Sequence, residues 1–225
     1  MTTHRRLEIG DWLQRLLPRV ESYGGERSCW VARTKTRNAE HHPPYYWLAR
    51  ALDDVERAGQ LGELRERLVA AHGADGCGGG GERDQRAQDV LSATCALAWA
   101  LEQLGPATLE HTADGERLLV RVPTIEAAIA PRRLWPARTL ELLLQQVAAG
   151  AEAAARDLDG AGALRGRIYY LDFNLSGPRF SYDVGYDGPL TEPVRAWLKH
   201  HAAERGLGWV LTRPFQWGTP IEAWY

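Results

Sequence analysis

Lysine, cysteine and long apolar runs are all scarce in this chain of 225 residues. Lys35 and Lys199 are its only lysines, so nearly all positive charge comes from arginine. The guanidinium group of arginine suits bidentate contacts with carboxylate or phosphate. No apolar stretch approaches the length of a membrane span, and charged and polar residues interrupt the N-terminal segment where a signal peptide would be continuous. We therefore expect a soluble, cytoplasmic protein with no membrane association.

The cysteine count and the net charge exclude two further classes. The three cysteines, Cys29, Cys77 and Cys95, are odd in number and form no CxxC pair, which argues against a disulfide framework and fits a reducing compartment. The net charge of −2 argues against an obligate nucleic-acid binder, which needs a basic surplus. A local basic patch stays compatible with this charge, so nucleic acid is not indicated but not excluded.

Apolar periodicity predicts a helix-rich α+β protein. Helices are predicted over residues 7–21, 45–69 with a break near Gly59 or Gly62, 84–104, 139–158 and 191–205. Strands are predicted within 28–37, in a hairpin over 108–122 around Asp114-Gly115, in a hairpin over 166–188 and over 209–212. We expect a single domain, 1–225, with an antiparallel sheet built from β-hairpins.

A glycine-rich segment at 73–81 interrupts this pattern. Its sequence, GADGCGGGG, predicts a flexible, protease-sensitive loop because ordering so many glycines has a large entropic cost. The segment follows a predicted helix and contains no Gly-Lys-Ser/Thr, so its G-x-G-x-x-G match does not indicate a phosphate site. It can separate an N-terminal helical part (1–72) from a C-terminal α+β part (82–225).

The hairpin predicted over 166–188 supplies the most specific candidate surface. Pairing across its turn places apolar and aromatic residues on one face, with Tyr169 opposite Tyr186. The other face carries Asn174, with Asp172 opposite Asp183 and Ile168 opposite Asp187. Two facing carboxylates repel, so they need a counter-charge, a metal, a shared proton or solvent screening. The face is interpreted either as a solvated outer face or as an acidic site for a cation or a basic partner.

Metal and nucleophile motifs are weak. Cys29, His41 and His42 share one stretch, but their spacing fits no zinc pattern, and we assign no metal site and no cofactor. The chain contains no G-x-S-x-G, no H-E-x-x-H and no cysteine in a recognisable protease context.

A metal-dependent nuclease of the D…(D/E)-x-K kind is a further hypothesis, because predicted helices and hairpins alternate. Asp114, Glu116, Asp172 and Asp183 would supply its carboxylates. Neither lysine follows an acid by two residues on a predicted strand, which weighs against an active enzyme of this type.

Aromatic residues are concentrated at the C-terminus. The chain has nine tryptophans, and Trp217, Trp224 and Tyr225 fall in a tail predicted to be irregular. Tryptophan and tyrosine dominate the energetic centres of protein interfaces, although a single ring is more often part of a core.

Two functional hypotheses follow. The first is a non-catalytic protein-interaction module, immunity-like, antitoxin-like or an accessory subunit, that binds a protein partner through the Asp172/Asp183/Asp187 face, Asn174 and the aromatic tail. The alternative is a metal-dependent hydrolase or nuclease-like enzyme that uses strand carboxylates. The residues alone do not decide between catalysis and binding.

Overall fold

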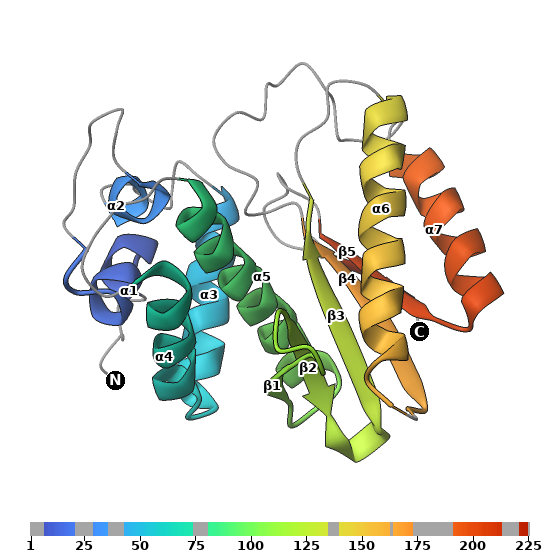
Figure 1. Ribbon diagram of the computed structural model, residues 1–225. Coiled ribbons are helices and arrows are strands. Elements are labelled where there is room, and N and C mark those ends of the chain that lie inside the picture. The colour runs from blue at the N-terminus through green and yellow to red at the C-terminus, as the bar shows by residue number, and fades with distance from the viewer. Residues whose placement is uncertain are drawn as a thin grey trace, which may run out of the picture. The chain divides into compact units, whose positions relative to one another are not determined.

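The computed structural model divides the chain into two compact units, residues 1–98 and residues 99–225 (Figure 1). The boundary between the units falls within helix α5, Gly81–Gln103. The described residues are 7–20, 29–35, 43–73, 81–134, 140–162, 164–172, 191–212 and 221–224. No helix among them is both long enough and apolar enough to cross a membrane.

The first unit is helical. Its helices are α1 (Ile9–Leu16), α2 (Trp30–Lys35), α3 (Pro43–Arg57), α4 (Leu61–His72) and the part of α5 up to Ala98. These agree with the helices predicted over 7–21, 45–69 and 84–104, including the break at Gly59. Its core consists of the apolar faces of these helices, with Trp12, Leu13, Leu48, Leu52, Leu68 and Leu91 fully or almost fully buried. Cys95 is buried in α5, as expected of a small hydrophobe.

Helices α1 and α2 lie against each other through a glycine. A Cβ added at Gly10 would come within 2.4 Å of the Lys35 carbonyl oxygen, so only glycine permits this approach. The Lys35 ammonium donates to the carbonyl oxygens of Leu17, at 2.7 Å, and Val20. These contacts satisfy acceptors just beyond the end of α1 and fix the end of α2 beside them.

The prediction of a strand within 28–37 is wrong, because residues 30–35 form α2. The β-branched and aromatic run Cys29-Trp30-Val31 favours a strand locally, but the helix receives a cap from far along the chain. The backbone N–H of Trp30 donates to the Asp84 carboxylate at 2.7 Å, across 54 residues. A side-chain acceptor at the first turn satisfies a donor that a helix otherwise leaves without a partner.

The second unit is built on a six-stranded sheet whose strands follow one another in chain order, β1-β2-β3-β4-β5-β6. Its elements, in chain order, are β1 (Thr108–His111), β2 (Leu118–Val122), a 3-10 helix (Pro123–Ile125), β3 (Ala127–Arg133), α6 (Leu140–Asp159), β4 (Gly166–Asp172), α7 (Thr191–Arg205), β5 (Gly208–Thr212) and β6 (Ile221–Trp224). The last residues of the tail, predicted as irregular, therefore include a strand that pairs with β5.

The sheet is mixed, so the prediction of a sheet built from antiparallel hairpins is only partly confirmed. The hairpin around Asp114-Gly115 is present, with Leu109 opposite Val120 and a positive φ of 73° at Gly115 that suits glycine. Strand β3 is antiparallel to β2, but β3 and β4 are parallel, and so are β4 and β5. Helices α6 and α7 make the two crossovers that parallel strands require.

The hairpin predicted over 166–188 is wrong along most of β4. Ile168 lies opposite Ile129 of β3 and Gly208 of β5, and Leu171 is likewise flanked by both strands. Because both edges of β4 are occupied, Tyr169 cannot pair with Tyr186, nor Ile168 with Asp187. The Asp172–Asp183 pair stays a prediction, because Asp183 lies outside the described residues.

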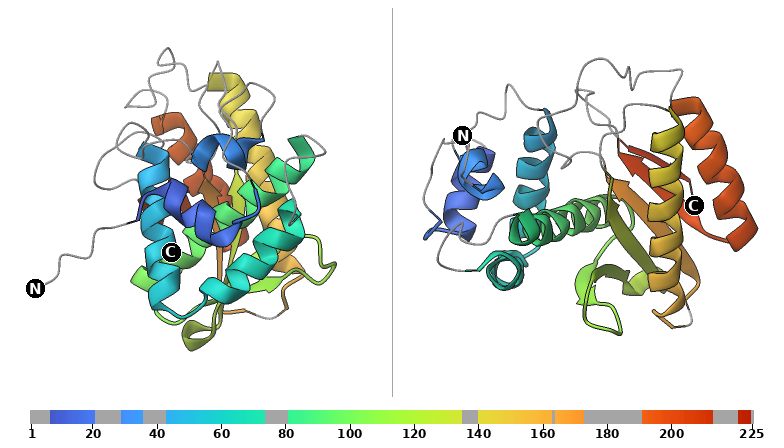
Figure 2. Two further views of the ribbon diagram at one scale, coloured as in Figure 1. Left: turned by 90° about the vertical axis from the view of Figure 1, so that its left-hand side faces the viewer. Right: turned by 45° about the horizontal axis from the view of Figure 1, so that its top comes forward.

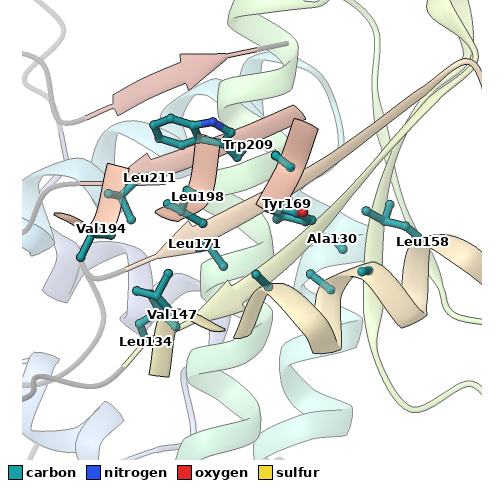
Figure 3. Packing of buried hydrophobic residues seen from close by; sticks show 14 of the residues in the cluster. Ala130, Leu134, Val147, Leu158, Tyr169, Leu171, Val194, Leu198, Trp209 and Leu211 are labelled. Carbon is teal, nitrogen blue, oxygen red and sulfur yellow. The ribbon is translucent and has the colours of Figure 1, made fainter. Parts of the chain in front are cut away.

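Helices α6 and α7 cover the same face of the sheet (Figure 2). Side chains alternate along a strand, so Tyr169 and Leu171 of β4 enter the core beneath these helices. Figure 3 shows Val147 of α6 and Leu198 of α7 packed toward this face. On the opposite face Tyr170 meets Trp99, with ring centroids 6.3 Å apart.

Candidate metal centre

Three helices of the first unit bring a cysteine, a histidine and a carboxylate together. Cys29 directly precedes α2, His72 is the last residue of α4, and Asp84 lies in the first turn of α5. One ligand atom from each, the sulfur, an imidazole nitrogen and a carboxylate oxygen, lies within 4.8 Å of the other two. Among the described residues this is the one group of three or more such side chains at this spacing.

The cluster is buried by the apolar faces of its own helices. Leu64, Leu68 and His72 follow one another at four-residue intervals and form the buried face of α4, so the helix periodicity carries the imidazole inward. Only 1% of His72 is exposed, and 13% of the Asp84 side chain. Burial makes any charge in the cluster dependent on an opposite charge.

Asp84 uses one carboxylate oxygen and leaves the other without a hydrogen bond. Its Oδ2 accepts the Trp30 N–H, whereas its buried Oδ1 has no hydrogen-bond partner and faces His72 Nε2 at 3.6 Å. Burial raises the pKa of this carboxyl, but the interactions with His72 and with the backbone N–H groups of Trp30 and Val31 outweigh burial and lower the pKa overall. A buried oxygen of an ionised carboxylate therefore points at the imidazole.

His72 presents a nitrogen with a lone pair to this oxygen when the ring is neutral. Its Nδ1 lies 3.3 Å from the Gly73 carbonyl oxygen, which can only accept, so Nδ1 carries the proton. Nε2 is then the unprotonated nitrogen of the neutral imidazole. A metal-binding histidine is usually held in this way, with its other ring nitrogen donating to a backbone carbonyl or a carboxylate.

Cys29 is disulfide-bonded, and its partner lies outside the described residues. Cys95 is a buried thiol outside any disulfide. The disulfide at Cys29 runs against the expectation, based on the odd cysteine count, that a disulfide framework is unlikely. A disulfide sulfur is neutral and a poor ligand, so only the reduced form of Cys29 supplies the thiolate that a metal requires.

The donor set of sulfur, nitrogen and oxygen fits zinc best among common protein metals. Zinc binds thiolate at about 2.3 Å and imidazole or carboxylate at about 2.0–2.2 Å, which sets tetrahedral ligand atoms roughly 3.5 Å apart. The three ligand atoms lie within 4.8 Å of one another, which is somewhat wider, so the distances between them would shorten by about 1 Å around an ion. Soft thiolate also disfavours calcium and magnesium, which prefer oxygen ligands.

The same three residue types also occur in nucleophilic triads, but the geometry differs. In a triad the histidine uses one nitrogen for the nucleophile and the other for the carboxylate, which places the imidazole between them. Here one nitrogen of His72 lies close to both Cys29 and Asp84, and Nδ1 is held by Gly73. The three donor atoms lie within 4.8 Å of one another, which suits an ion better than a proton relay.

A second histidine–carboxylate cluster lies in the second unit and is fully hydrogen-bonded. His201 Nε2 lies 2.9 Å from Glu152 Oε1, and His201 Nδ1 lies 3.0 Å from the Tyr169 hydroxyl. Glu152 also accepts two hydrogen bonds of 2.8 Å from Arg205, and the Trp197 ring stacks on the imidazole at 4.6 Å. Burial raises the pKa of Tyr169 to about 12. This cluster ties α6, α7 and β4 together and leaves His201 no nitrogen for a ligand.

Of the residues predicted from the sequence to bind a partner, only Asp172 and Trp224 lie in the described part of the chain, on different strands. Asp172 is the last residue of β4, opposite Arg133, and Trp224 is the last residue of β6, opposite Trp209. The rest of the predicted surface lies outside the described residues, namely Asn174, Asp183, Asp187, Trp217 and Tyr225. His41 and His42 lie outside them too.

Two carboxylates of the nuclease hypothesis, those of Asp114 and Glu116, lie in the turn between β1 and β2. Asp114 accepts hydrogen bonds from the Thr112 hydroxyl and, at 3.0 Å, from the Glu116 N–H, which shapes the turn between β1 and β2. Both acidic residues line a pocket of about 370 Å³ with Arg117 and Arg156. The pocket has mixed charge, and no metal-binding group forms among its described residues.

Cys29 could be recognised from the sequence as a candidate ligand, but His72 and Asp84 could not. Both residues are far from Cys29 in the chain, 43 and 55 positions further on, and only the fold brings them near it. One signal was available: His72 and Asp84 lie on either side of the glycine-rich segment 73–81, where the ends of two consecutive helices can meet.

The chain matches no protein-family model, no curated protein and no solved structure. The functional assignment therefore depends on the geometry of the two clusters.

Proposed function

We propose that the chain is a non-catalytic binding protein whose first unit holds one divalent transition-metal ion, with zinc the best fit, at Cys29, His72 and Asp84. One observation carries this proposal: the buried Asp84 Oδ1 has no hydrogen-bond partner and faces a histidine nitrogen beside a cysteine sulfur. An ion at this point would neutralise the carboxylate and use the His72 lone pair.

The ion would have a structural role. Cys29, His72 and Asp84 lie at the ends of three different helices, so one ion would join α2, α4 and α5. In small metal-binding domains the free energy of metal binding contributes directly to folding. The three described ligands leave a fourth zinc position for a further protein donor or water.

Metal retention by the reduced protein tests this proposal. The chain is stripped with a chelator, reduced with a phosphine, loaded with Zn²⁺ and passed through a desalting column before elemental analysis. We expect about one ion per chain in the wild type, and little in His72→Ala and Asp84→Asn. His200→Ala is the matched control, because His200 is a mostly exposed histidine near Glu204. Absence of zinc in the wild type, or equal zinc in all four proteins, would reject the site.

Cobalt gives a second readout that identifies the ligands. Reduced wild type loaded with Co²⁺ should show the near-ultraviolet charge-transfer absorption of a thiolate ligand together with the visible bands of tetrahedral coordination. Cys29→Ser should lose the charge-transfer band, whereas Cys95→Ser should keep it. A spectrum that is unchanged in Cys29→Ser would mean that the metal binds elsewhere.

We also propose that the second unit binds a protein partner, as the sequence suggested. The supporting observation is that β6 is the last strand of the sheet in the described part of the chain, which places Trp224 on an edge. An edge strand with an aromatic residue is a common site of strand addition by a partner.

A tagged pull-down tests the partner proposal. The wild type should retain one protein in stoichiometric amount, and the charge reversals Asp172→Lys and Asp183→Lys should lose it. Retention that is unaffected by both reversals would remove the acidic face from the proposal.

A further inference from the structure

The sulfur of Cys29 takes part in two arrangements that exclude each other. It is disulfide-bonded, and it also lies within 4.8 Å of the His72 nitrogen and the Asp84 oxygen. Zinc requires a thiolate, and a sulfur in a disulfide carries no such charge. The same atom can therefore close a disulfide or complete the metal site, but not both.

The other two ligands are held in place while the disulfide is present. His72 is oriented by the Gly73 carbonyl, and Asp84 by the Trp30 N–H. Both anchors are backbone groups at helix ends. In this state His72 Nε2 still faces the Asp84 carboxylate at 3.6 Å, so the cluster differs from a ligand set only at the sulfur.

We infer that the oxidation state of Cys29 controls the metal site, so that disulfide formation expels the ion and reduction admits it. This inference rests on the proposed metal-binding function and adds its regulation. The thiol redox state of the surroundings would then determine whether an ion joins α2, α4 and α5.

The chemistry balances with a dithiol as reductant and a peroxide as oxidant. A dithiol attacks the disulfide, passes through a mixed disulfide and leaves as a cyclic disulfide, while the protein gains two thiols. The Cys29 thiol then releases a proton as its sulfur binds Zn²⁺. In reverse, two cysteine thiolates, one peroxide and two protons give one disulfide and two waters (for hydrogen peroxide), and the ion is released.

The chain itself offers one candidate for the second sulfur. Of its three cysteines, Cys95 is outside any disulfide, which leaves Cys77. Cys77 lies outside the described residues and, in the sequence, stands between His72 and Asp84. Peptide mapping of the oxidised protein should therefore link the peptides that contain Cys29 and Cys77. A Cys29 thiol that stays reduced in metal-free, oxidised protein would overturn the inference.

The decisive experiment measures zinc affinity in three states of the full chain: oxidised with peroxide, reduced with a dithiol that is then removed, and oxidised again. Competition with a chromophoric zinc chelator gives the affinity in each state. We expect oxidised protein to bind zinc more weakly by about a hundredfold or more, since even outer-shell changes at metal sites cost 10–100-fold. The second oxidation should return the affinity to the first value.

Matched variants separate the outcomes. Cys95→Ser removes a cysteine outside the cluster and should leave the redox difference unchanged, whereas Cys29→Ser should bind weakly in every state. Equal zinc affinity in oxidised and reduced wild type would overturn the redox inference and leave the metal site intact. Absence of zinc binding in the reduced wild type would instead reject the proposed function.

Discussion

His72 in the first unit and His201 in the second are both buried and both face a carboxylate, yet their surroundings differ. His201 contacts Glu152 at 2.9 Å through one nitrogen and the Tyr169 hydroxyl at 3.0 Å through the other. His72 uses one nitrogen for a backbone carbonyl, and its other nitrogen lies 3.6 Å from a carboxylate oxygen that has no hydrogen-bond partner. Both ring nitrogens of His201 thus have side-chain partners, whereas the buried Asp84 Oδ1 beside His72 has no hydrogen-bond partner.

This difference distinguishes a structural cluster from a ligand site more clearly than residue type does. A buried polar network that satisfies every donor and acceptor rigidifies the fold, whereas an unsatisfied buried group costs free energy until something binds it. The cluster around His201 gives an added ion no lone pair. The cluster around His72 offers one, together with a carboxylate and a cysteine sulfur. Zinc, pH and conservative substitutions should therefore act differently on the two units.

Zinc should produce the largest effect, and only in the first unit. With the chain reduced and Zn²⁺ at about a thousand times its dissociation constant, binding to the folded state alone adds about 4 kcal/mol to the free energy of unfolding. Urea unfolding followed by far-ultraviolet circular dichroism, with and without zinc, measures this gain. His72→Ala should lose it.

The matched change in the second unit sharpens this test. His201→Ala should lower the stability of the protein but keep the full gain from zinc, because no ligand of the ion is altered. A gain that disappears in His201→Ala and persists in His72→Ala would reverse our assignment of the two clusters.

Alkaline pH should produce the next largest effect, in the second unit. Burial raises the pKa of Tyr169 to about 12, so the folded protein keeps this proton at a pH where the unfolded chain loses it. The stabilisation is fully present below about pH 10, the usual pKa of tyrosine, and is lost between about pH 10 and 12. A shift of about 2 pKa units corresponds to about 2–3 kcal/mol.

Tyr169→Phe separates this effect from the titration of the other tyrosines. The difference in unfolding free energy between wild type and variant should shrink as the pH rises through this range, as measured by urea unfolding at several pH values. A constant difference would mean that Tyr169 ionises normally in the folded protein.

Most of the fold could be predicted from the sequence, and the failures have non-local causes. The periodicity of apolar residues located the long helices, because burial of one face repeats every few residues. It could not show that β4 has parallel neighbours on both edges, because alternating residues look the same whichever strands flank them. It also predicted a strand at Trp30, where a carboxylate 54 residues away starts a helix.

The candidate site was less predictable than the fold for a related reason. Cys29 was recognised as a possible ligand, but it was grouped with His41 and His42, its neighbours in sequence. Its actual neighbours come from the end of α4 and the start of α5, and their approach depends on how three helices pack. Pairings of this kind follow from tertiary structure, and no spacing rule for zinc motifs includes them.

A smaller effect should follow from Asp84→Asn in the oxidised, metal-free protein. Asparagine can still accept the Trp30 N–H, so the helix cap survives, but the charge is lost and we expect a cost of about 1 kcal/mol. Because the pKa of Asp84 is lowered in the folded state, its contribution is present at neutral pH and is lost as the pH falls through that lowered pKa.

Urea unfolding of both proteins from neutral pH down through the carboxyl range checks this point. The two stabilities should converge in acid. If Asp84→Asn were instead more stable than the wild type at neutral pH, the Asp84 charge would destabilise the metal-free protein. The cluster around His72 would then differ even more from the cluster around His201.

Glu152→Gln should have the smallest effect. Glutamine keeps one oxygen acceptor, for His201, but loses the charge opposite Arg205 and one of the two oxygens that accept hydrogen bonds from Arg205. This ion pair is about 40% exposed on both sides. Exposed ion pairs contribute about 0.2–1 kcal/mol, so we expect a loss of about 0.5 kcal/mol in urea unfolding and no change in zinc retention. Glu204→Gln, beside the exposed His200, is the control and should be nearly neutral. A loss above about 2 kcal/mol would show that Glu152 carries the network around His201 as a charge, and the two histidine clusters would then differ less than their hydrogen bonds indicate.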